Sequence, residues 1–195
     1  DWPKAWRSAN AQGKSIGLTP SNQGVIKLFN AGLDDYSIYA IDLPGHGKSD
    51  GESKSSIDAY SSDVIDFLDT MRLENVCLVG HSMGAAIALN ASLTKHWRIC
   101  SVVAIGGASK MLVSDSILEG LQKTFEATVD NIVKYSWHKK TGAIADSQQM
   151  AAYFREKAKQ RILDAGPKTV HGDFLACSKF DLDDRLEEIS VPVLV

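Results

Sequence analysis

The stretch that most limits what this chain can fold into is Val76–Leu89, which reads VCLVGHSMGAAIAL. Residues 76–79 form an uncharged apolar run, typical of a buried strand, and residues 85–89 have the composition of a helix. Between them, residues 80–84 carry the pattern Gly-x-Ser-x-Gly, with Ser82 at its centre. A strand, a sharp turn and a helix in this order, with this pattern at the turn, predict a nucleophile elbow.

Such a turn holds its serine in a strained backbone conformation. We expect Gly80 and Gly84 to let the strand and the helix pass closely, and the amide of Met83 to point toward an oxyanion formed beside Ser82. His81 completes the turn and is interpreted as a packing residue that points away from the serine. The alternative is a glycine-rich turn of a nucleotide-binding unit, but G-x-G-x-x-G and the Walker pattern are both absent.

Composition narrows the class of protein. The 195 residues are 23 % charged, with a formal net charge of −3 and scattered basic residues, which is typical of a soluble globular protein of one domain, or of one domain with an insertion. We therefore expect neither a nucleic-acid partner nor a membrane partner. No run of about 18 apolar residues predicts a transmembrane helix, and the first residues do not resemble a signal peptide.

The cysteines are Cys77, Cys100 and Cys177, widely spaced and without a C-x-x-C pair. Such a set argues against a disulfide framework or a zinc site, and it favours a reducing, cytoplasmic location. Cys77 lies in the apolar run and is predicted to be a small core residue. No group of His, Asp and Glu has metal-ligand spacing, so neither a metal nor another cofactor is expected.

Strand and helix patterns alternate around the turn. The predicted strands are 36–43 (YSIYAIDL), 76–79, 101–105 and 191–195. The predicted helices are 22–31, about 57–71 with Ser55 or Ser56 as its cap, 85–94, and a short charged helix over 181–188. Uncharged strands that alternate with amphipathic helices predict a mostly parallel sheet with helices on both faces.

A different pattern occupies residues 112–176, where only helical periods occur and Gly166-Pro167 interrupts them. The apolar residues that mark these helices are Ile117, Leu121, Phe125, Val129 and Ile132, followed by Met150, Phe154 and Ile162. About 65 residues of helix between two strands predict an inserted cap rather than a crossover connection. We therefore expect a core over 1–110, a helical cap over 111–178, and a return to the core over 179–195.

Three spaced segments resemble the α/β-hydrolase superfamily, in its branch of small capped esterases, lactonases and perhydrolase-like enzymes. They are DLPGHGKS at 42–49, LVGHSMG at 78–84, and 180–195, which ends in ISVPVLV. The resemblance covers about residues 16–195. It implies the α/β-hydrolase fold and acyl transfer, in which Ser82 attacks an ester-like carbonyl, a histidine takes its proton and a carboxylate orients that histidine.

The chain departs from this family near both of its ends. The family's catalytic acid usually follows the strand that is 191–195 here, and its histidine follows the next strand. Both would lie beyond Val195, so the sequence is interpreted as a fragment. At the front, the family's His-Gly pair would fall at Ile16-Gly17, where the histidine is absent. By position, Leu18 is the candidate for the second oxyanion amide, beside Met83.

Several other side chains are candidates for catalytic or binding groups. His46 is interpreted as fixing its own loop, His171 is a candidate pocket residue of the cap, and Asp115 is interpreted as a helix cap. Two further sets are surface candidates: His96 and His138, and the charged helix face of Asp181, Asp183 and Asp184. Residues that either line an apolar pocket or pack the core of the cap are Met111, Phe125, Trp137, Met150, Tyr153 and Phe154.

Together these features predict a serine hydrolase that acts on a carboxylic ester or lactone of a small, partly apolar molecule. Serine at the turn argues against dehalogenase and epoxide hydrolase chemistry, which uses aspartate there, but it leaves carbon–carbon bond hydrolysis, perhydrolysis and lyase reactions open. A catalytically silent binding module of the same fold is the alternative from another class. The sequence does not indicate an oligomeric state.

Overall fold

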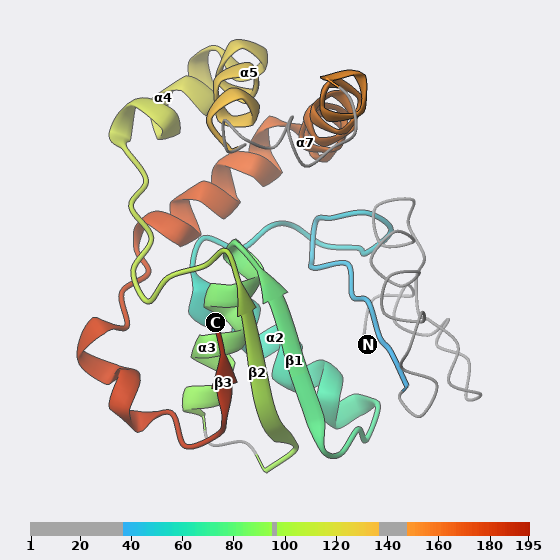
Figure 1. Ribbon diagram of the computed structural model, residues 1–195, viewed down its shortest axis with the longest axis vertical. Helices are drawn as coiled ribbons and strands as arrows, with labels where there is room; N and C mark the ends of the chain where they lie inside the picture. The colour runs from blue at the N-terminus through green and yellow to red at the C-terminus, as the bar shows by residue number, and fades with distance from the viewer. Residues whose placement is uncertain (1–36, 95–96, 137–147) are drawn as a thin grey trace. The chain divides into compact units, whose positions relative to one another are not determined.

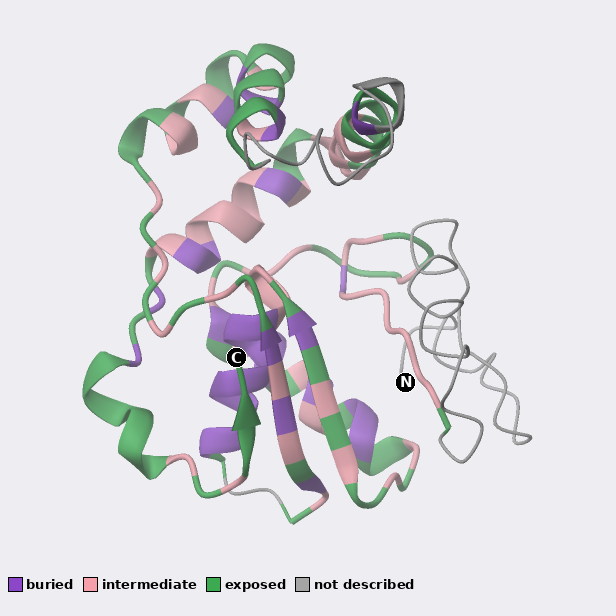
Figure 2. Cartoon of the chain, in the orientation of Figure 1, coloured by how far each residue is buried: buried purple, intermediate pink, exposed green. Residues whose placement is uncertain are grey.

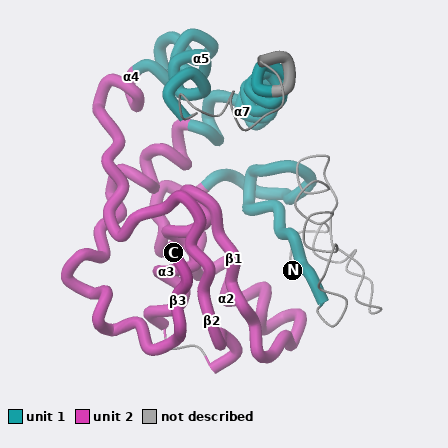
Figure 3. Tube along the Cα trace, in the orientation of Figure 1, with its two compact units in different colours: residues 1–53, 120–170 teal, residues 54–119, 171–195 magenta. Residues whose placement is uncertain are grey.

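The computed structural model describes residues 37–94, 97–136 and 148–195. Leu18 and the helix predicted over 22–31 lie outside the described residues. The chain divides into two compact units (Figure 3). We call them the helical unit, residues 1–53 and 120–170, and the sheet unit, residues 54–119 and 171–195. The predicted core, cap and return to the core follow chain connectivity rather than compactness, and that division stays a prediction.

The sheet unit contains three parallel strands in the order β1-β2-β3 (Figure 1). They are β1 (Val76–His81), β2 (Ile99–Ile105) and β3 (Val193–Leu194). The predicted parallel sheet is therefore present. The last strand is shorter than predicted, because only Val193 and Leu194 pair with β2.

Two helices lie on one side of this sheet, α2 (Ile57–Thr70) and α3 (Met83–Leu93). Helix α3 packs on β1 and β2, and α2 packs on α3. Ser56 caps α2, as predicted, because its Oγ accepts a hydrogen bond from the amide of Ala59 at 3.2 Å. The apolar stripe of α2 is buried, and its buried apolar residues are Ile57, Tyr60, Val64, Phe67 and Leu68. Every residue of α3 from Ala85 to Leu93 is buried, which explains why its sequence is apolar all round rather than amphipathic.

A buried polar network fixes α3 against α2. The side-chain amide of Asn90 donates to Asp58 Oδ1 at 3.0 Å and to Ser61 Oγ at 3.1 Å. The Ser61 hydroxyl lies within hydrogen-bond distance of the carbonyl oxygens of Ile57 and Ile87, at 2.9 and 3.2 Å. Because buried polar groups are costly unless they are paired, this network holds the two helices in one register.

In Figure 2, α3 is mostly buried, whereas the strands of the sheet carry buried, half-buried and exposed residues. Both α2 and α3 lie on one face, under which Val102 is only 1 % exposed. On the other face, Val79 and Ile105 are 45 % and 47 % exposed. We call these the covered face and the open face of the sheet unit. Cys77 lies on the open face and is exposed, so its prediction as a core residue is wrong.

Residues 37–43, the described part of a predicted strand, form no strand. They contain the β-branched and aromatic residues that favour a pleated chain. A strand also requires a hydrogen-bonded neighbour, and none of the described residues pairs with this segment in a ladder. The strand predicted over 36–43 is therefore absent from its described residues, 37–43.

The described helical region contains α4 (Asp115–Lys123), α5 (Phe125–Tyr135) and α7 (Gln148–Ser178). The helical period predicted over 117–132 is interrupted at Thr124, where φ is −143° and ψ is 57°. Gly166 breaks α7 at a φ of 82°, as the Gly166-Pro167 pair predicted. None of the described helices has the length and apolar character that crossing a membrane would need.

Within the helical unit, Leu121, Val129 and Val133 are buried. The predicted buried stripe on α7 is wrong at Phe154, which is 48 % exposed and packs edge-on against Tyr153 with ring centroids 5.7 Å apart. This part of α7 therefore presents aromatic side chains to solvent within its unit.

The segments that leave β2 and return toward β3 are paired with each other. The amide of Met111 donates to the Phe180 carbonyl at 3.3 Å, and Lys110 forms an ion pair with Asp181. Asp183, the first residue of the 3₁₀ helix η2 (Asp183–Glu188), accepts a hydrogen bond from the Ser109 hydroxyl at 2.5 Å. The acidic residues predicted as a solvated helix face are exposed, but two of them are bonded to this neighbouring segment.

Candidate active site around Ser82

The turn between β1 and α3 holds Ser82 at φ 54° and ψ −118°. A positive φ is uncommon for any residue other than glycine. The predicted backbone strain at Ser82 is therefore confirmed. The surrounding backbone supports it. The Ser82 amide donates to the Ile105 carbonyl at 2.9 Å, and the Ser82 carbonyl accepts from the Ala85 amide at 2.9 Å.

The two glycines of the turn have different roles. A Cβ atom on Gly80 would lie deep inside the contact distance of the Gly84 carbonyl, so only glycine allows β1 and α3 to approach this closely. A Cβ atom on Gly84 would have no neighbour within 4 Å. We predicted that both glycines are needed for the close approach of β1 and α3. This is correct for Gly80 and wrong for Gly84, where a Cβ atom would fit.

Gly107 is a further close-contact position that the sequence pattern did not indicate. It follows β2, and a Cβ atom there would overlap the Ala85 side chain and would lie 3.4 Å from the Ser82 carbonyl oxygen. Because Gly107 has no side chain, its backbone can lie against the first turn of α3 without overlapping Ala85. The only sequence signal was its place directly after a predicted strand.

Met83 is the first residue of α3. The first amides of an α-helix have no acceptor within the helix, and the helix dipole makes this end attractive to negative charge. The amides of Ala85 and Ala86 already bond the Ser82 carbonyl, at 2.9 and 3.3 Å. The amide of Met83 is therefore at a position from which it can donate to an atom outside the helix.

His81 is exposed and lies on the open face, with its ring near Gly106. Within residues 37–94, 97–136 and 148–195, no histidine is hydrogen-bonded to the Ser82 hydroxyl. His96, His138 and Trp137 lie outside the described residues.

His46 acts on its own loop, as predicted. Its Nδ1 lies 3.1 Å from the Pro44 carbonyl, to which it can donate. In the same loop Asp42 binds two residues: its Oδ2 accepts from the Lys48 amide at 3.1 Å, and its carbonyl accepts from the Ser49 hydroxyl at 2.6 Å. The sequence DLPGHGKS therefore closes on itself through hydrogen bonds between its ends.

The sheet unit contains two ionisable groups, Tyr60 and Cys177, whose environments the sequence did not predict. The Tyr60 hydroxyl donates to Asp173 Oδ1 at 2.5 Å and accepts from the Lys54 amide at 2.9 Å. Burial, with the Asp173 carboxylate, raises the pKa of Tyr60 far above its usual value. Burial also raises the pKa of the Cys177 thiol to about 12. At neutral pH both groups therefore stay protonated, which makes them poor nucleophiles.

The remaining candidates occupy ordinary positions. Asp115 is in the first turn of α4, where a carboxylate favours the helix dipole. His171 is half-buried on α7. Neither is bonded to Ser82 in the described part of the chain. Whether the cap residues line a pocket stays a prediction.

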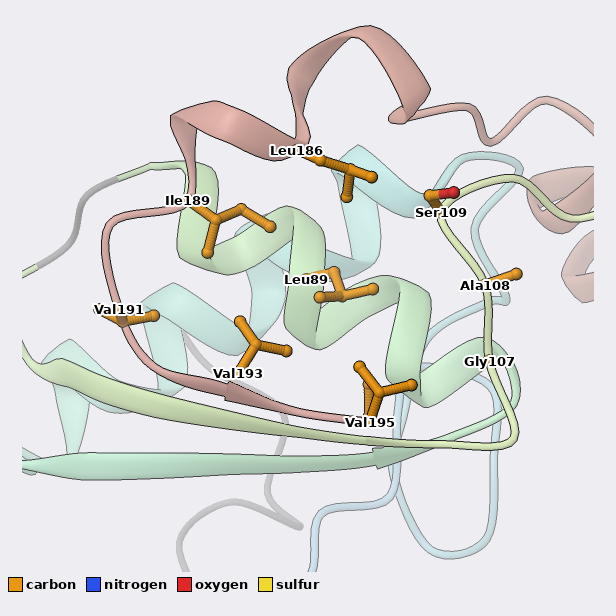
Figure 4. Close-up of a pocket in the computed structure, with 10 residues that line it drawn as sticks. Leu89, Gly107, Ala108, Ser109, Leu186, Ile189, Val191, Val193 and Val195 are labelled. Atoms are coloured by element: carbon orange, nitrogen blue, oxygen red, sulfur yellow. The ribbon is translucent and has the colours of Figure 1, made fainter.

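An apolar pocket of about 450 Å³ lies beside α3 in the sheet unit (Figure 4). Its walls come from α3, the segment after β2, η2 and the final strand. The lining residues are Leu89, Ala104, Gly107, Ala108, Ser109, Leu186, Ile189, Val191, Val193 and Val195. Gly107 belongs both to this pocket and to the close contact with the Ser82 turn.

A parallel sheet with helices between its strands, and a serine at positive φ between β1 and α3, are features of the α/β-hydrolase fold. Residues 18–195 match the family model described as the alpha/beta hydrolase family. The chain belongs to that family.

Several proteins with enzyme names are similar to this chain. A Mycoplasma pneumoniae protein with an esterase/lipase name is 29 % identical over 163 residues, which cover 82 % of this chain and 56 % of that protein. The 3-oxoadipate enol-lactonase 1 of Acinetobacter baylyi is 25 % identical, with coverage of 95 % and 76 %. The structure of a thermophilic esterase has a TM-score of 0.62 at 28 % identity, with coverage of 79 % and 57 %. The chain spans just over half the length of the first and third proteins.

Proposed function

We propose that the protein is a serine hydrolase that cleaves a carboxylic ester or lactone, and that Ser82 is its nucleophile. The observation that carries this proposal is the backbone of Ser82. A non-glycine residue at φ 54°, placed where a parallel strand meets a helix, is strained. Strain of this kind persists at functional sites because it presents a side chain for reaction.

Two groups of this turn have roles in the proposed reaction. The Ser82 Oγ attacks the substrate carbonyl, and the resulting oxyanion accepts a hydrogen bond from the Met83 amide at the start of α3. Leu18 supplies the second oxyanion amide by its position in the family pattern. A histidine and a carboxylate complete the mechanism, and the family resemblance assigns both to the region that follows β3.

The substrate class rests on the relatives, which carry esterase, lipase and lactonase names. The proposed substrate is a small, partly apolar ester or lactone. The helical segment between β2 and β3 is proposed to act as the cap over it. The three cysteines are free, which supports a cytoplasmic location.

The test is covalent labelling with a fluorophosphonate probe, which reacts with activated serines. The protein is expressed with any residues that follow Val195 in its gene. We expect labelling of the wild type and its complete loss in Ser82→Ala. Ser116→Ala is the matched control, because Ser116 is exposed and lies on α4. It should label like the wild type.

Three outcomes are distinguishable. Labelling at Ser82 together with turnover of ester or lactone substrates supports the proposal. Labelling at Ser82 without turnover of any ester or lactone would point to another reaction of the same serine, such as carbon–carbon bond hydrolysis, perhydrolysis or a lyase reaction. A folded protein that is not labelled at Ser82 would show a catalytically silent binding module instead.

A further inference from the structure

The segment that leaves β2 lies directly against the Ser82 turn. The Ser82 amide donates to the carbonyl of Ile105, the last residue of β2, at 2.9 Å. Two residues later, a Cβ atom on Gly107 would lie 3.4 Å from the Ser82 carbonyl oxygen. The backbone conformation of Ser82 therefore depends on where residues 105–107 are held.

Two consecutive glycines make this segment easy to bend. Gly106 has a φ of 56°, in the region that favours glycine, and Gly107 follows it. One residue, Ala108, separates this pair from Ser109 (Figure 4). Because glycines restrict the backbone little, interactions beyond the pair have to fix the path of the segment. Such interactions begin at Ser109.

A short antiparallel bridge holds residues 109–111. The Leu182 amide donates to the Ser109 carbonyl at 2.8 Å, and the Met111 amide donates to the Phe180 carbonyl at 3.3 Å. Phe180 and Leu182 are both buried, and all of these residues belong to the sheet unit. The segment that leaves β2 is therefore tied to a buried part of the chain in the same unit as Ser82.

Two side-chain bonds reinforce this bridge, and both end on a carboxylate. Lys110 forms an ion pair with Asp181, and the Ser109 hydroxyl donates to Asp183 at 2.5 Å. The Asp183 amide in turn donates to the Asp181 carboxylate at 3.1 Å. The hydrogen bond between Lys110 and Asp181 lowers the pKa of the carboxyl and raises the pKa of the amine, so both groups are charged at neutral pH. Hydrogen bonds to charged groups are about twice as strong as neutral ones.

We propose that Ser109, Lys110, Asp181 and Asp183 form a clasp that positions the Ser82 turn for reaction. The inference rests on the proposed hydrolase function. The clasp fixes the glycine pair from one end, as β2 fixes it from the other. When the clasp opens, the glycines can rotate and the backbone that supports Ser82 shifts. A small misplacement of a nucleophile slows its reaction, because the geometry of attack is no longer set in advance. The four residues are therefore positioning residues, which act through the segment between β2 and Ser109.

The test measures the rate at which an uncharged fluorophosphonate probe labels Ser82, in the protein expressed with any residues that follow Val195 in its gene. Lys110→Met removes the ion pair and keeps the length of the side chain, and we expect labelling about fivefold slower than in the wild type. Lys110→Arg keeps the charge and should label like the wild type. Salt screens ion pairs, so the wild-type rate should fall toward that of Lys110→Met as sodium chloride is added, while the rate of Lys110→Met stays constant.

Two further variants and a control complete the series. Asp181→Asn removes the same ion pair from its other end and should slow labelling as Lys110→Met does. Ser109→Ala removes the second side-chain bond, and combined with Lys110→Met it should slow labelling more than either change alone. Arg185→Gln is the matched control, because it removes an ion pair that joins Arg185 to Glu188 within η2. It should label like the wild type. Thermal melts of each variant check that labelling is measured on folded protein.

Hydrogen exchange provides a readout that needs no catalysis. The Leu182 amide belongs to the bridge, and the Ser82 amide is bonded to the residue before the glycine pair. In Lys110→Met both amides should exchange faster than in the wild type, because local opening exposes them to water more often. Arg185→Gln should leave the exchange of both amides unchanged.

Two results would overturn the proposal. One is faster exchange at Leu182 with no change in the exchange or the labelling of Ser82, which would show that the clasp and the turn are independent. The other is slower labelling in Lys110→Met that Lys110→Arg does not restore. A wild type that is never labelled, but whose Ser82 exchange still responds to Lys110→Met, would contradict the hydrolase proposal and support the clasp.

Discussion

The covered and open faces of the sheet have similar amino acids and different surroundings. Val102 on the covered face is almost fully buried under α3, while Val79 and Ile105 on the open face remain nearly half exposed. The strands that form both faces read as continuous apolar runs. Apolar sequence therefore identifies these segments as strands, but the burial of a given residue depends on which elements cover its face.

The largest expected difference is between Val102→Asp and Val79→Asp. A carboxylate at position 102 would be buried without a partner, and we expect a loss of at least about 4 kcal/mol in unfolding free energy or a failure to fold. At position 79 the carboxylate reaches solvent, and the loss should be no more than about 1 kcal/mol. Urea denaturation of both variants measures this. Equal losses would show that the open face is covered in solution.

The glycines of the Ser82 turn provide a second matched pair. Gly80→Ala places a methyl group against the Gly84 carbonyl, and we expect a loss of about 3 kcal/mol because backbone must move. Gly84→Ala has open space and lies in α3, so it should be neutral or stabilising by up to about 1 kcal/mol. Thermal melts of the two variants give the comparison. A destabilised Gly84→Ala would contradict the open space at that position.

Tyr60 tests the helix layer that covers the sheet. Tyr60→Phe removes the hydroxyl that bonds Asp173 Oδ1 and the Lys54 amide, and we expect a loss of about 1–3 kcal/mol in unfolding free energy. Asp173→Asn keeps an oxygen that can accept the bond, so its loss should be smaller. If Asp173→Asn proved the more harmful of the two, the carboxylate would have a role beyond accepting this bond.

The raised pKa of Tyr60 predicts that the stability of the protein depends on pH. Burial and Asp173 raise the pKa of Tyr60 in the folded protein, whereas the unfolded chain loses the phenol proton near pH 10. The contribution to stability is therefore complete below about pH 10 and declines as the pH rises further, by up to about 1.4 kcal/mol per pH unit. Chemical denaturation of wild type and Tyr60→Phe between pH 9 and 11 should show this decline in the wild type only, after common effects are subtracted.

Much of this fold could be predicted from local sequence. The strand–turn–helix around Ser82, the cap of α2 at Ser56 and the break at Gly166 all depend on residues close in the chain, whose preferences are strong. The errors concern long-range pairing. Residues 37–43 have the composition of a strand but no described partner, and the register shift between Val76 and Cys77 exists only in relation to β2.

The candidate site also has a part that the local sequence predicts and a part that depends on contacts between distant segments. Ser82 and the first amide of α3 follow from one contiguous motif, so the sequence was sufficient to place them. Gly107 and Asp173 were not predicted as partners of the elements they contact, because each contact joins segments far apart in the chain. No periodicity or spacing rule describes such a contact before the strands and helices are paired in space.

The smallest expected effect returns to the open face. Cys77→Ser replaces a thiol with a hydroxyl of similar size, and the exposed position lets water hydrate that hydroxyl. We therefore expect a change in unfolding free energy within about 0.5 kcal/mol, measured by urea denaturation under reducing conditions. Cys177→Ser is the control at a buried position of α7, where burying the more polar hydroxyl should cost about 1 kcal/mol or more. A loss at Cys77 as large as that at Cys177 would mean that the first residues of β1 are covered on both faces.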